Sequence, residues 1–135
     1  MARPSVLFVC THNAGRSQMA AGFLSQLSGG TIDVASAGTA PAEALNPSVV
    51  AAMLEAGIDL RQEEPKLLTD EALASADLVI TLGYDLAGLR PDPRFTHWDF
   101  SDPAGSRLDA VRAIRDAIRL RVEALVSNLN APAAA

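Results

Sequence analysis

Apolar residues follow two different spacings along this chain, and the two spacings alternate. Four short runs rich in apolar and β-branched residues are predicted to be strands: Ser5–Cys10, Thr31–Ala37, Asp77–Leu82 and Phe95–Trp98. Ser5–Cys10 is apolar at nearly every position (SVLFVC), which is typical of a strand buried on both faces of a parallel sheet. Gly38 ends the second run, and Pro91 and Pro93 interrupt the chain before the fourth.

Between these runs, apolar residues recur at intervals of three and four and predict helices. The predicted helices begin at Ser17 and Pro47, cover Asp70–Ala76 behind a Thr69 cap, and extend from Arg107 to Leu129. The last of them is amphipathic, and its arginines are expected on the water-facing side. Strands that alternate with helices predict an α/β fold, in which a parallel sheet is covered by helices on both faces.

The length and charge of the chain limit what it can be. At 135 residues we expect a single domain over residues 1–135, with Asn130–Ala135 as a frayed tail. The net charge of −5, with no basic block, argues against nucleic-acid binding and gives an anion no long-range attraction. No apolar stretch reaches the length of a membrane span, and no signal-peptide pattern precedes the first strand. We therefore expect a cytoplasmic protein without membrane contact, and a monomer.

The segment from Cys10 to Ser17 (CTHNAGRS) lies between the first strand and the first helix, at the carboxyl edge of the sheet. If it curls, its backbone N–H groups converge beside the positive end of the helix dipole and bind an anion. The expected oxyanion-binding residues are Thr11, His12, Asn13, Ala14, Gly15 and Arg16. The planar guanidinium of Arg16 can hold two anion oxygens, which a lysine cannot do. Asn13 and Gly15 tolerate the positive φ that such a loop often needs.

Cys10 is the one cysteine in the sequence, so no disulfide can form within the chain. A lone cysteine most often packs as a small apolar side chain. Its position at the start of an anion-binding loop instead favours a reactive thiolate, because donors that bind an anion also stabilise a thiolate. Ser17 is expected to donate a hydrogen bond to that sulfur, whereas His12 is assigned no acid–base role.

A thiolate that attacks an oxyanion needs an acid to protonate the oxygen that leaves. Asp102 is the candidate, in the loop after the fourth strand that reads WDFSDPAG over residues 98–105. That loop also lies at the carboxyl edge of the sheet, within reach of Cys10. An Asp-Pro pair is by itself an ordinary turn signal, and Asp99 is a competing candidate in the same loop.

These motifs resemble those of the low-molecular-weight tyrosine phosphatase superfamily and, within it, the arsenate reductases. Cys10–Ser17 is similar to the family's oxyanion loop, in which five residues separate the cysteine from Arg-Ser. The Ser17–Ala20 segment (SQMA) and the Asp102–Gly105 segment (DPAG) resemble the reductases more than the phosphatases. The resemblance implies a four-stranded parallel sheet in the order 2-1-3-4, and it implies the role of general acid for Asp102.

The sequence also departs from that family's patterns. Thioredoxin-coupled reductases are expected to carry two further cysteines, the first at the end of the third strand. Here the third strand ends Thr81-Leu82-Gly83-Tyr84, and the segment to Pro91 contains no sulfur. Potassium-binding reductases carry a carboxylate early in the first helix, where this chain reads Ala20-Ala21-Gly22, so no metal is expected. We expect no tightly bound cofactor, and an external thiol of the mycothiol, bacillithiol or glutathione type as reductant.

These observations together predict an external-thiol-dependent arsenate reductase. Cys10 attacks arsenate, Arg16 and the loop amides hold the oxygens, and Asp102 protonates the departing oxygen. Phosphate and sulfate are expected to mimic arsenate, and a mycoredoxin-, glutaredoxin- or thioredoxin-like protein is expected to complete the reduction. Two alternatives stay open: a phosphatase in which water attacks the Cys10 intermediate, and a non-catalytic oxyanion-binding module. A module that only binds needs neither Cys10 nor Asp102.

Overall fold

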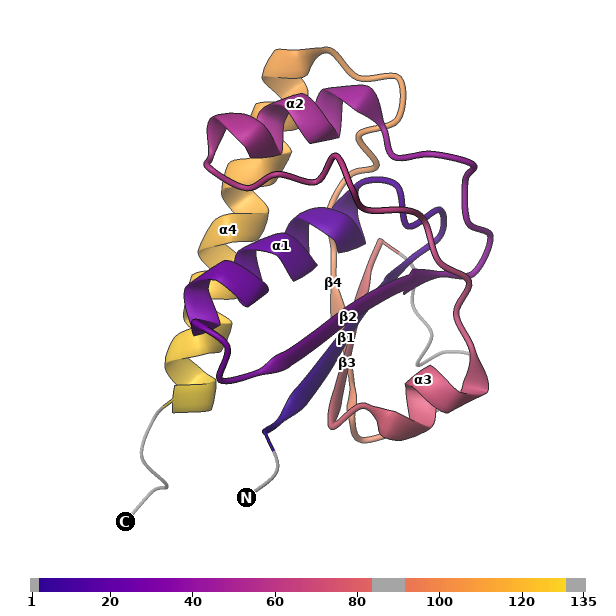
Figure 1. The fold of residues 1–135 in the computed structure, drawn as a ribbon, viewed down its shortest axis with the longest axis vertical. Helices are drawn as coiled ribbons and strands as arrows, with labels where there is room; N and C mark the ends of the chain where they lie inside the picture. The colour runs from indigo at the N-terminus through magenta and orange to yellow at the C-terminus, as the bar shows by residue number, and fades with distance from the viewer. Residues whose placement is uncertain (1–2, 84–91, 131–135) are drawn as a thin grey trace.

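The computed structural model describes residues 3–83 and 92–130, and a parallel sheet of four strands lies at its centre (Figure 1). The strands are β1 (Ser5–Cys10), β2 (Asp33–Gly38), β3 (Leu78–Leu82) and β4 (Phe95–Trp98). They lie in the order β2-β1-β3-β4, and each neighbouring pair is parallel. The predicted fold class and strand order are confirmed.

Strand β1 lies in the middle of the sheet because its side chains are apolar on both faces. Val6 and Phe8 pack in one layer of the core together with Cys10, and Leu7 and Val9 pack in the other. None of these five side chains is more than 2% exposed. A strand buried on both sides is held firmly, so its carboxyl end fixes the position of Cys10 at the edge of the sheet.

Within residues 3–83 and 92–130, three helices cover one face of the sheet and one short helix covers the other (Figure 1). The larger layer contains α1 (Arg16–Ser28), α2 (Pro47–Glu55) and α4 (Leu108–Asn130), and the opposite face carries α3 (Asp70–Ser75). Phe23 of α1 joins Phe8 in the larger core, and Leu73 of α3 joins Leu7 and Val9 in the smaller core. The prediction of helices on both faces is confirmed.

Two helices begin where the sequence places a capping residue. The side chain of Asn46 accepts a hydrogen bond from the Ser48 amide, and Pro47 is the first residue of α2. Thr69 caps α3 as predicted, because its hydroxyl oxygen accepts from the Ala72 amide at 3.1 Å. These caps satisfy amides that have no partner within the helix.

The ends of several elements differ from the prediction by one or two residues. Thr31 was predicted to open the second strand, but its amide and its hydroxyl both donate to the carbonyl of Ser28, at 3.2 and 2.8 Å. It therefore belongs to the turn after α1, and β2 begins at Asp33. Helix α4 continues to Asn130, which was predicted to lie in a frayed tail; residues 131–135 lie outside the described residues.

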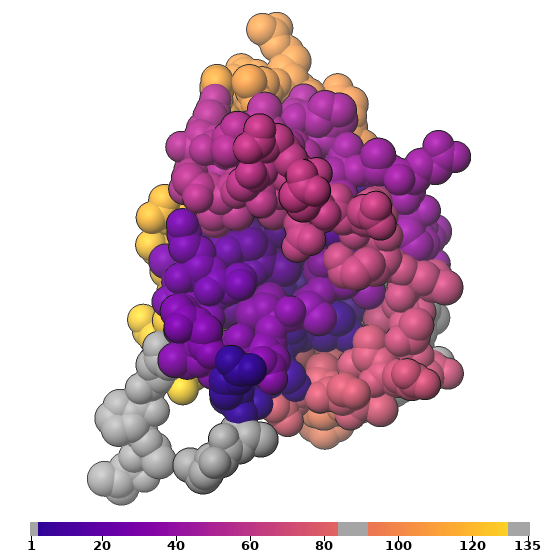
Figure 2. Space-filling view, viewed as in Figure 1, coloured from indigo at the N-terminus to yellow at the C-terminus, as the bar shows by residue number. Residues whose placement is uncertain are grey.

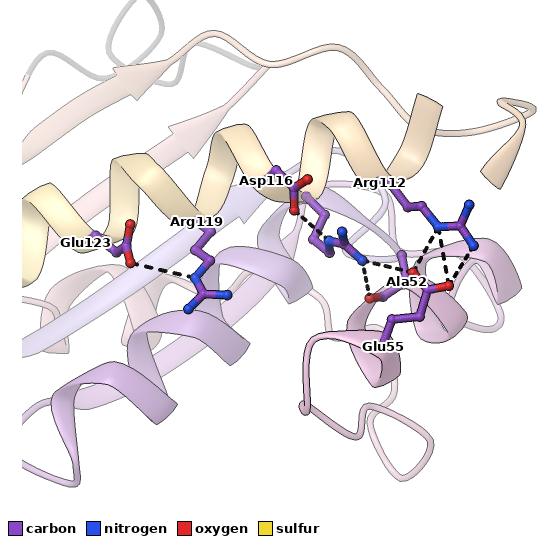
Figure 3. A network of polar contacts seen from close by, with 7 residues as sticks. Ala52, Glu55, Arg112, Asp116, Arg119 and Glu123 are labelled. Atoms are coloured by element: carbon purple, nitrogen blue, oxygen red, sulfur yellow. Dashed lines mark hydrogen bonds and ion pairs between the residues drawn. The ribbon is translucent and has the colours of Figure 1, made fainter. Parts of the chain in front are cut away.

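The prediction that the arginines of α4 face water is wrong for Arg115. Its side chain is 14% exposed and donates to the Ala52 carbonyl at 2.9 Å and to the Glu55 carboxylate at 3.0 Å (Figure 3). Arg112 binds the same carboxylate at 2.7 Å. The long stem of an arginine can bury apolar surface while its charge finds a partner, so the spacing of apolar residues alone does not show which arginines are buried.

Helix α1, strand β2 and the chain after α2 meet on the face of the molecule seen in Figure 2. A hollow of about 590 Å³ is lined there by residues that include Gln18, Ser36 and Lys66.

Helix α4 has 23 residues and is strongly charged. No helix within residues 3–83 and 92–130 is long and apolar enough to cross a membrane.

Candidate active site

The loop after β1 turns tightly at the carboxyl edge of the sheet. Asn13 adopts a φ of 49°, in the left-handed region expected for it, and is completely buried. Gly15 has a φ of −145°, so the expectation of a positive φ there is wrong. A Cβ atom at Gly15 would lie 2.8 Å from Cγ of Pro103, so this glycine allows the Asp102 loop to approach the oxyanion loop closely.

The carbonyl groups of this loop are hydrogen-bonded to the segment that follows β2. The carbonyl of Thr11 accepts a hydrogen bond from the Ala40 amide at 2.8 Å. In the same way the carbonyl of His12 accepts from Ala42, and that of Ala14 from Asn46, each at 3.0 Å. In a trans peptide the N–H group points opposite to the carbonyl. The N–H groups that follow these three carbonyls therefore point away from that segment, as an anion cradle on the other side of the loop requires. Asn13 shows this directly, because its amide donates to Sγ of Cys10 at 3.3 Å.

The sulfur of Cys10 is buried, yet polar groups surround it. Oγ of Ser17 lies 2.9 Å from Sγ. The side-chain amide of Asn13 donates to that same oxygen at 2.7 Å, so the Ser17 hydroxyl links Asn13 to the sulfur. The sulfur of Cys10 thus accepts a hydrogen bond from the backbone of Asn13 and shares another with Ser17. A cysteine that only packs as an apolar side chain needs neither of them.

Gln18 was not among the predicted site residues, although it ties this loop to the chain after α2. Its side-chain nitrogen donates to the backbone and side-chain oxygens of Asn13 at 3.2 and 3.1 Å, and to the Glu64 carbonyl at 3.2 Å. The Lys66 amide donates to the same side-chain oxygen of Asn13 at 2.9 Å. Two donors therefore turn the Asn13 amide so that its nitrogen faces Ser17. Local spacing gave no signal of this contact, because Glu64 is 46 residues from Gln18.

Arg16 and Asp102 lie next to each other. Arg16 is buried, its Nη1 donates to the Phe100 carbonyl at 3.0 Å, and its Nη2 lies 3.7 Å from Oδ2 of Asp102. The other oxygen of Asp102 accepts from the Ala104 amide at 2.9 Å, and the side chain is 46% exposed. A carboxyl group in that position can exchange protons with water and still reach the anion site.

A small cavity of about 40 Å³ brings these groups together. It is lined by Cys10, His12, Ala14, Gly15, Arg16, Asn46, Asp102, Pro103 and Ala104. Since one water needs roughly 10–15 Å³ by this kind of measure, the cavity has room for a small ion. The hollows of about 590 and 520 Å³ are lined by neither Cys10 nor Arg16.

The structure does not place every predicted residue in the lining of this cavity. Thr11, Asn13 and Ser17 are not part of it, and the contacts of Asn13 and Ser17 are with the sulfur instead. Asp99, the competitor of Asp102, is exposed and does not line it. Asn46 lines the cavity but was not predicted to do so. In the sequence it is typical of a helix cap, and nothing local indicates that it also lies beside the oxyanion loop.

The family of this chain follows from a comparison with known proteins. Residues 5–134 match the model of a family described as low molecular weight phosphotyrosine protein phosphatase. The chain belongs to this family. An arsenate reductase of Staphylococcus aureus (strain N315) is 35% identical to it over 127 residues, which are 91% of this chain and 96% of that protein.

Solved structures of family members with two different activities are similar to this phosphatase-family chain. A thioredoxin-dependent arsenate reductase from Corynebacterium glutamicum superposes with a TM-score of 0.78 at 33% identity, and the match covers 96% of this chain and 62% of that one. The YwlE arginine phosphatase from Geobacillus stearothermophilus superposes with a TM-score of 0.84 at 26% identity, over 93% of this chain and 92% of that one. The fold therefore does not by itself decide between reduction and hydrolysis.

The groups that this family member places at its cavity define the chemistry available there. Cys10 offers a nucleophile, Arg16 an anion-binding fork and Asp102 a proton donor. Within the described residues, no three His, Cys, Asp or Glu side chains are grouped so that they could hold a metal ion. Acyl, phosphoryl or arsenyl transfer to a thiolate fits these groups.

Proposed function

We propose that this chain is an arsenate reductase in which Cys10 is the nucleophile and a thiol from outside the chain completes the reaction. One observation carries the proposal: the buried sulfur of Cys10 borders a cavity of about 40 Å³ together with Arg16 and Asp102. The relatives named arsenate reductase, at 35% identity over nearly the whole chain, support arsenate as the oxyanion.

In the first step, the Cys10 thiolate attacks arsenic(V). A sulfur–arsenic bond forms and one arsenic–oxygen bond breaks, while Asp102 gives its proton so that the oxygen leaves as water. Arg16 and the loop amides hold the remaining oxygens and stabilise the charge that develops on them. Arsenic is still in the +5 state at the end of this step, so no electrons have yet been transferred.

In the second step, an external thiol attacks the arsenic and releases Cys10 as a thiolate. The sequence contains a single cysteine, so the second sulfur must come from another molecule. A further thiol then attacks the sulfur of the conjugate, a disulfide forms, and two electrons reduce arsenic to arsenite. We propose a mycothiol-, bacillithiol- or glutathione-type thiol for the attack on arsenic and a mycoredoxin-, glutaredoxin- or thioredoxin-like protein for regeneration.

Arsenite release measured with each reducing system separately tests this proposal. The parent protein and the Cys10→Ser variant are incubated with arsenate and with thioredoxin, glutathione, mycothiol or bacillithiol systems in parallel. We expect arsenite from the parent with at least one small-thiol system and none from Cys10→Ser. Release of arsenite by the serine variant at a rate near that of the parent would exclude Cys10 as the nucleophile.

A phosphatase is the second candidate, because the similar structure from G. stearothermophilus is an arginine phosphatase and arsenate and phosphate share shape and charge. The same residues would act, with water in place of the thiol in the second step. Hydrolysis of phosphoarginine and of an aryl phosphate, compared with thiol-dependent arsenite release, separates the two activities. If the protein binds phosphate but catalyses neither reaction, a non-catalytic oxyanion-binding module remains.

A further inference from the structure

Asn46, the residue before α2, borders the oxyanion cavity although it lies outside the oxyanion loop. Its backbone amide donates to the carbonyl of Ala14 at 3.0 Å, and its side-chain oxygen accepts from the Ser48 amide at 2.9 Å. Its side-chain nitrogen lies 3.5 Å from the carbonyl oxygen of Pro103. Asn46 therefore joins the oxyanion loop to the loop that carries Asp102.

The cap of α2 decides which end of the Asn46 side-chain amide is the nitrogen. Because the Ser48 amide is a donor, the atom of Asn46 that faces it has to be the oxygen. The nitrogen consequently lies on the other side of the amide, where it faces the carbonyl of Pro103. The donor end of Asn46 is thus held toward the Asp102 loop.

This nitrogen can donate to more than Pro103. A side-chain amide carries two hydrogens, and the distance of 3.5 Å to the Pro103 carbonyl is at the long limit of a hydrogen bond. Arg16 and Asn46 both line the cavity with N–H groups, and they reach it from different segments of the chain. An anion in this cavity therefore lies close to a neutral donor from outside the oxyanion loop.

We propose that Asn46 is a substrate-binding residue of the oxyanion site: its side-chain nitrogen donates to an oxygen of the bound anion on the side of the Asp102 loop. A hydrogen bond to a charged oxygen is stronger than one to a neutral carbonyl, so the anion competes successfully with Pro103 for this donor. The proposal rests on the oxyanion site of the proposed function. It does not depend on whether arsenate reduction or phosphate hydrolysis takes place there.

Serine and aspartate at position 46 separate the anion contact from the helix cap. Both cap helices about as well as asparagine, so α2 keeps its cap in Asn46→Ser and in Asn46→Asp. Both lack the nitrogen, and aspartate also brings a negative charge to the cavity. The backbone amide that holds the Ala14 carbonyl is present in every variant. Thr69→Ala is the control for loss of a cap, because Thr69 caps α3 on the opposite face of the sheet (Figure 1).

The experiment is an amide NMR titration of the full chain with inorganic phosphate, which also detects weak binding. We expect phosphate to bind about tenfold more weakly to Asn46→Ser, as for loss of a hydrogen bond to a charged group, and more weakly still to Asn46→Asp. Thr69→Ala should bind phosphate within about twofold of the parent, although it unfolds at a lower temperature. Thermal unfolding of each variant shows that the comparison is made between folded proteins. An affinity of Asn46→Ser within about twofold of that of the parent would overturn the proposal.

A second measurement separates direct contact with the anion from an effect through the Asp102 loop. The Ala104 amide donates to Asp102 at 2.9 Å, so its NMR signal reports the position of that loop. Without phosphate, this signal should be nearly the same in Asn46→Ser and in the parent. The loss of affinity should also persist when Asn46→Ser is made in the Asp102→Ala background.

A displaced Ala104 signal, or a loss that disappears in the Asp102→Ala background, would mean that Asn46 only positions the loop, and would overturn the proposal. A protein that binds phosphate in the expected pattern but does not reduce arsenate contradicts the proposed function and leaves the role of Asn46 intact. A parent protein that binds no phosphate would contradict both.

Discussion

At the scale of single residues, Asn13 and Ser17 supply the polar contacts of the Cys10 sulfur. The backbone of Asn13 donates to the sulfur at 3.3 Å, and the oxygen of Ser17 lies at 2.9 Å. A cysteine that only packs as an apolar side chain would need neither contact. The sequence predicts the contact with Ser17, but the part of Gln18 in orienting Asn13 appears only in three dimensions.

Arg16 is expected to act through the shape of its guanidinium as well as through its charge. Arg16→Lys keeps the positive charge but loses the planar fork, so kcat/KM for arsenate should fall on the order of a hundredfold or more. Steady-state kinetics of the purified variant measures this. A fall of less than about threefold would mean that Arg16 acts through charge alone or through packing.

Asp102 is expected to supply the proton that leaves with the first oxygen. Asp102→Asn should slow formation of the Cys10 adduct about a hundredfold or more and remove the loss of rate that deprotonation of an acid causes at high pH. Asp99→Asn is the matched control, because Asp99 lies in the same loop but does not line the cavity. Rapid-mixing experiments over a range of pH compare the two variants, and the opposite pattern would transfer the role to Asp99.

At the scale of the elements, helix α4 is joined to α2 by charge as well as by apolar packing. Hydrogen bonds from Arg112, with further donors from Arg115, lower the pKa of the Glu55 carboxyl from 4.5 to about 2 (Figure 3). A carboxyl group whose pKa falls on folding stabilises the fold above its unfolded pKa, and this contribution disappears as the pH drops toward about 2. The pairs are partly exposed, so salt should weaken the effect.

Glu55→Gln therefore should lower the free energy of unfolding at about pH 7, and the difference from the parent should shrink between about pH 4.5 and pH 2. Urea unfolding at several pH values measures both. Glu123→Gln serves as the control, since Glu123 pairs with Arg119 within α4 alone (Figure 3). An equal loss in the two variants, or a Glu55→Gln difference that persists at low pH, would contradict this account.

The elements themselves were largely predictable from the sequence, and the contacts between them were not. β1 and β4 begin and end at the predicted residues, because their apolar runs are bounded by residues that stop a strand. Thr31 was misassigned because a single threonine fits both a strand and a turn. The burial of Arg115 depends on Glu55, which lies 60 residues away in the sequence, and no local pattern contains that information.

In the candidate site, too, the individual residues could be predicted from the sequence but the contacts between distant segments could not. Its nucleophile, its arginine and its acidic residue are each marked by a motif, and the structure brings Cys10, Arg16 and Asp102 to one cavity. The reason for a glycine at position 15 was mistaken, because the approach of Pro103 comes from a segment 88 residues further along the chain, counted from 15 to 103.

At the scale of the whole molecule, the decisive feature is that the chain holds one sulfur able to form a disulfide. Neither folding nor rearrangement can supply a second thiol within these 135 residues, so the proposed reduction requires a thiol from another molecule. The small cavity favours a small thiol over a protein thiol as the first attacker in the proposed reaction, because Cys10 as a residue is only 2% exposed.

Trapping followed by mass spectrometry tests this claim most directly. The protein is mixed with arsenate and one candidate thiol at a time, the reaction is stopped by alkylation, and the species on Cys10 and on the thiol are weighed. The account predicts a thiol–arsenic conjugate, or a mixed disulfide at Cys10, with the physiological thiol, and no sustained arsenite release without it. Multiple turnovers with thioredoxin and its reductase alone, in the absence of any small thiol, would contradict it.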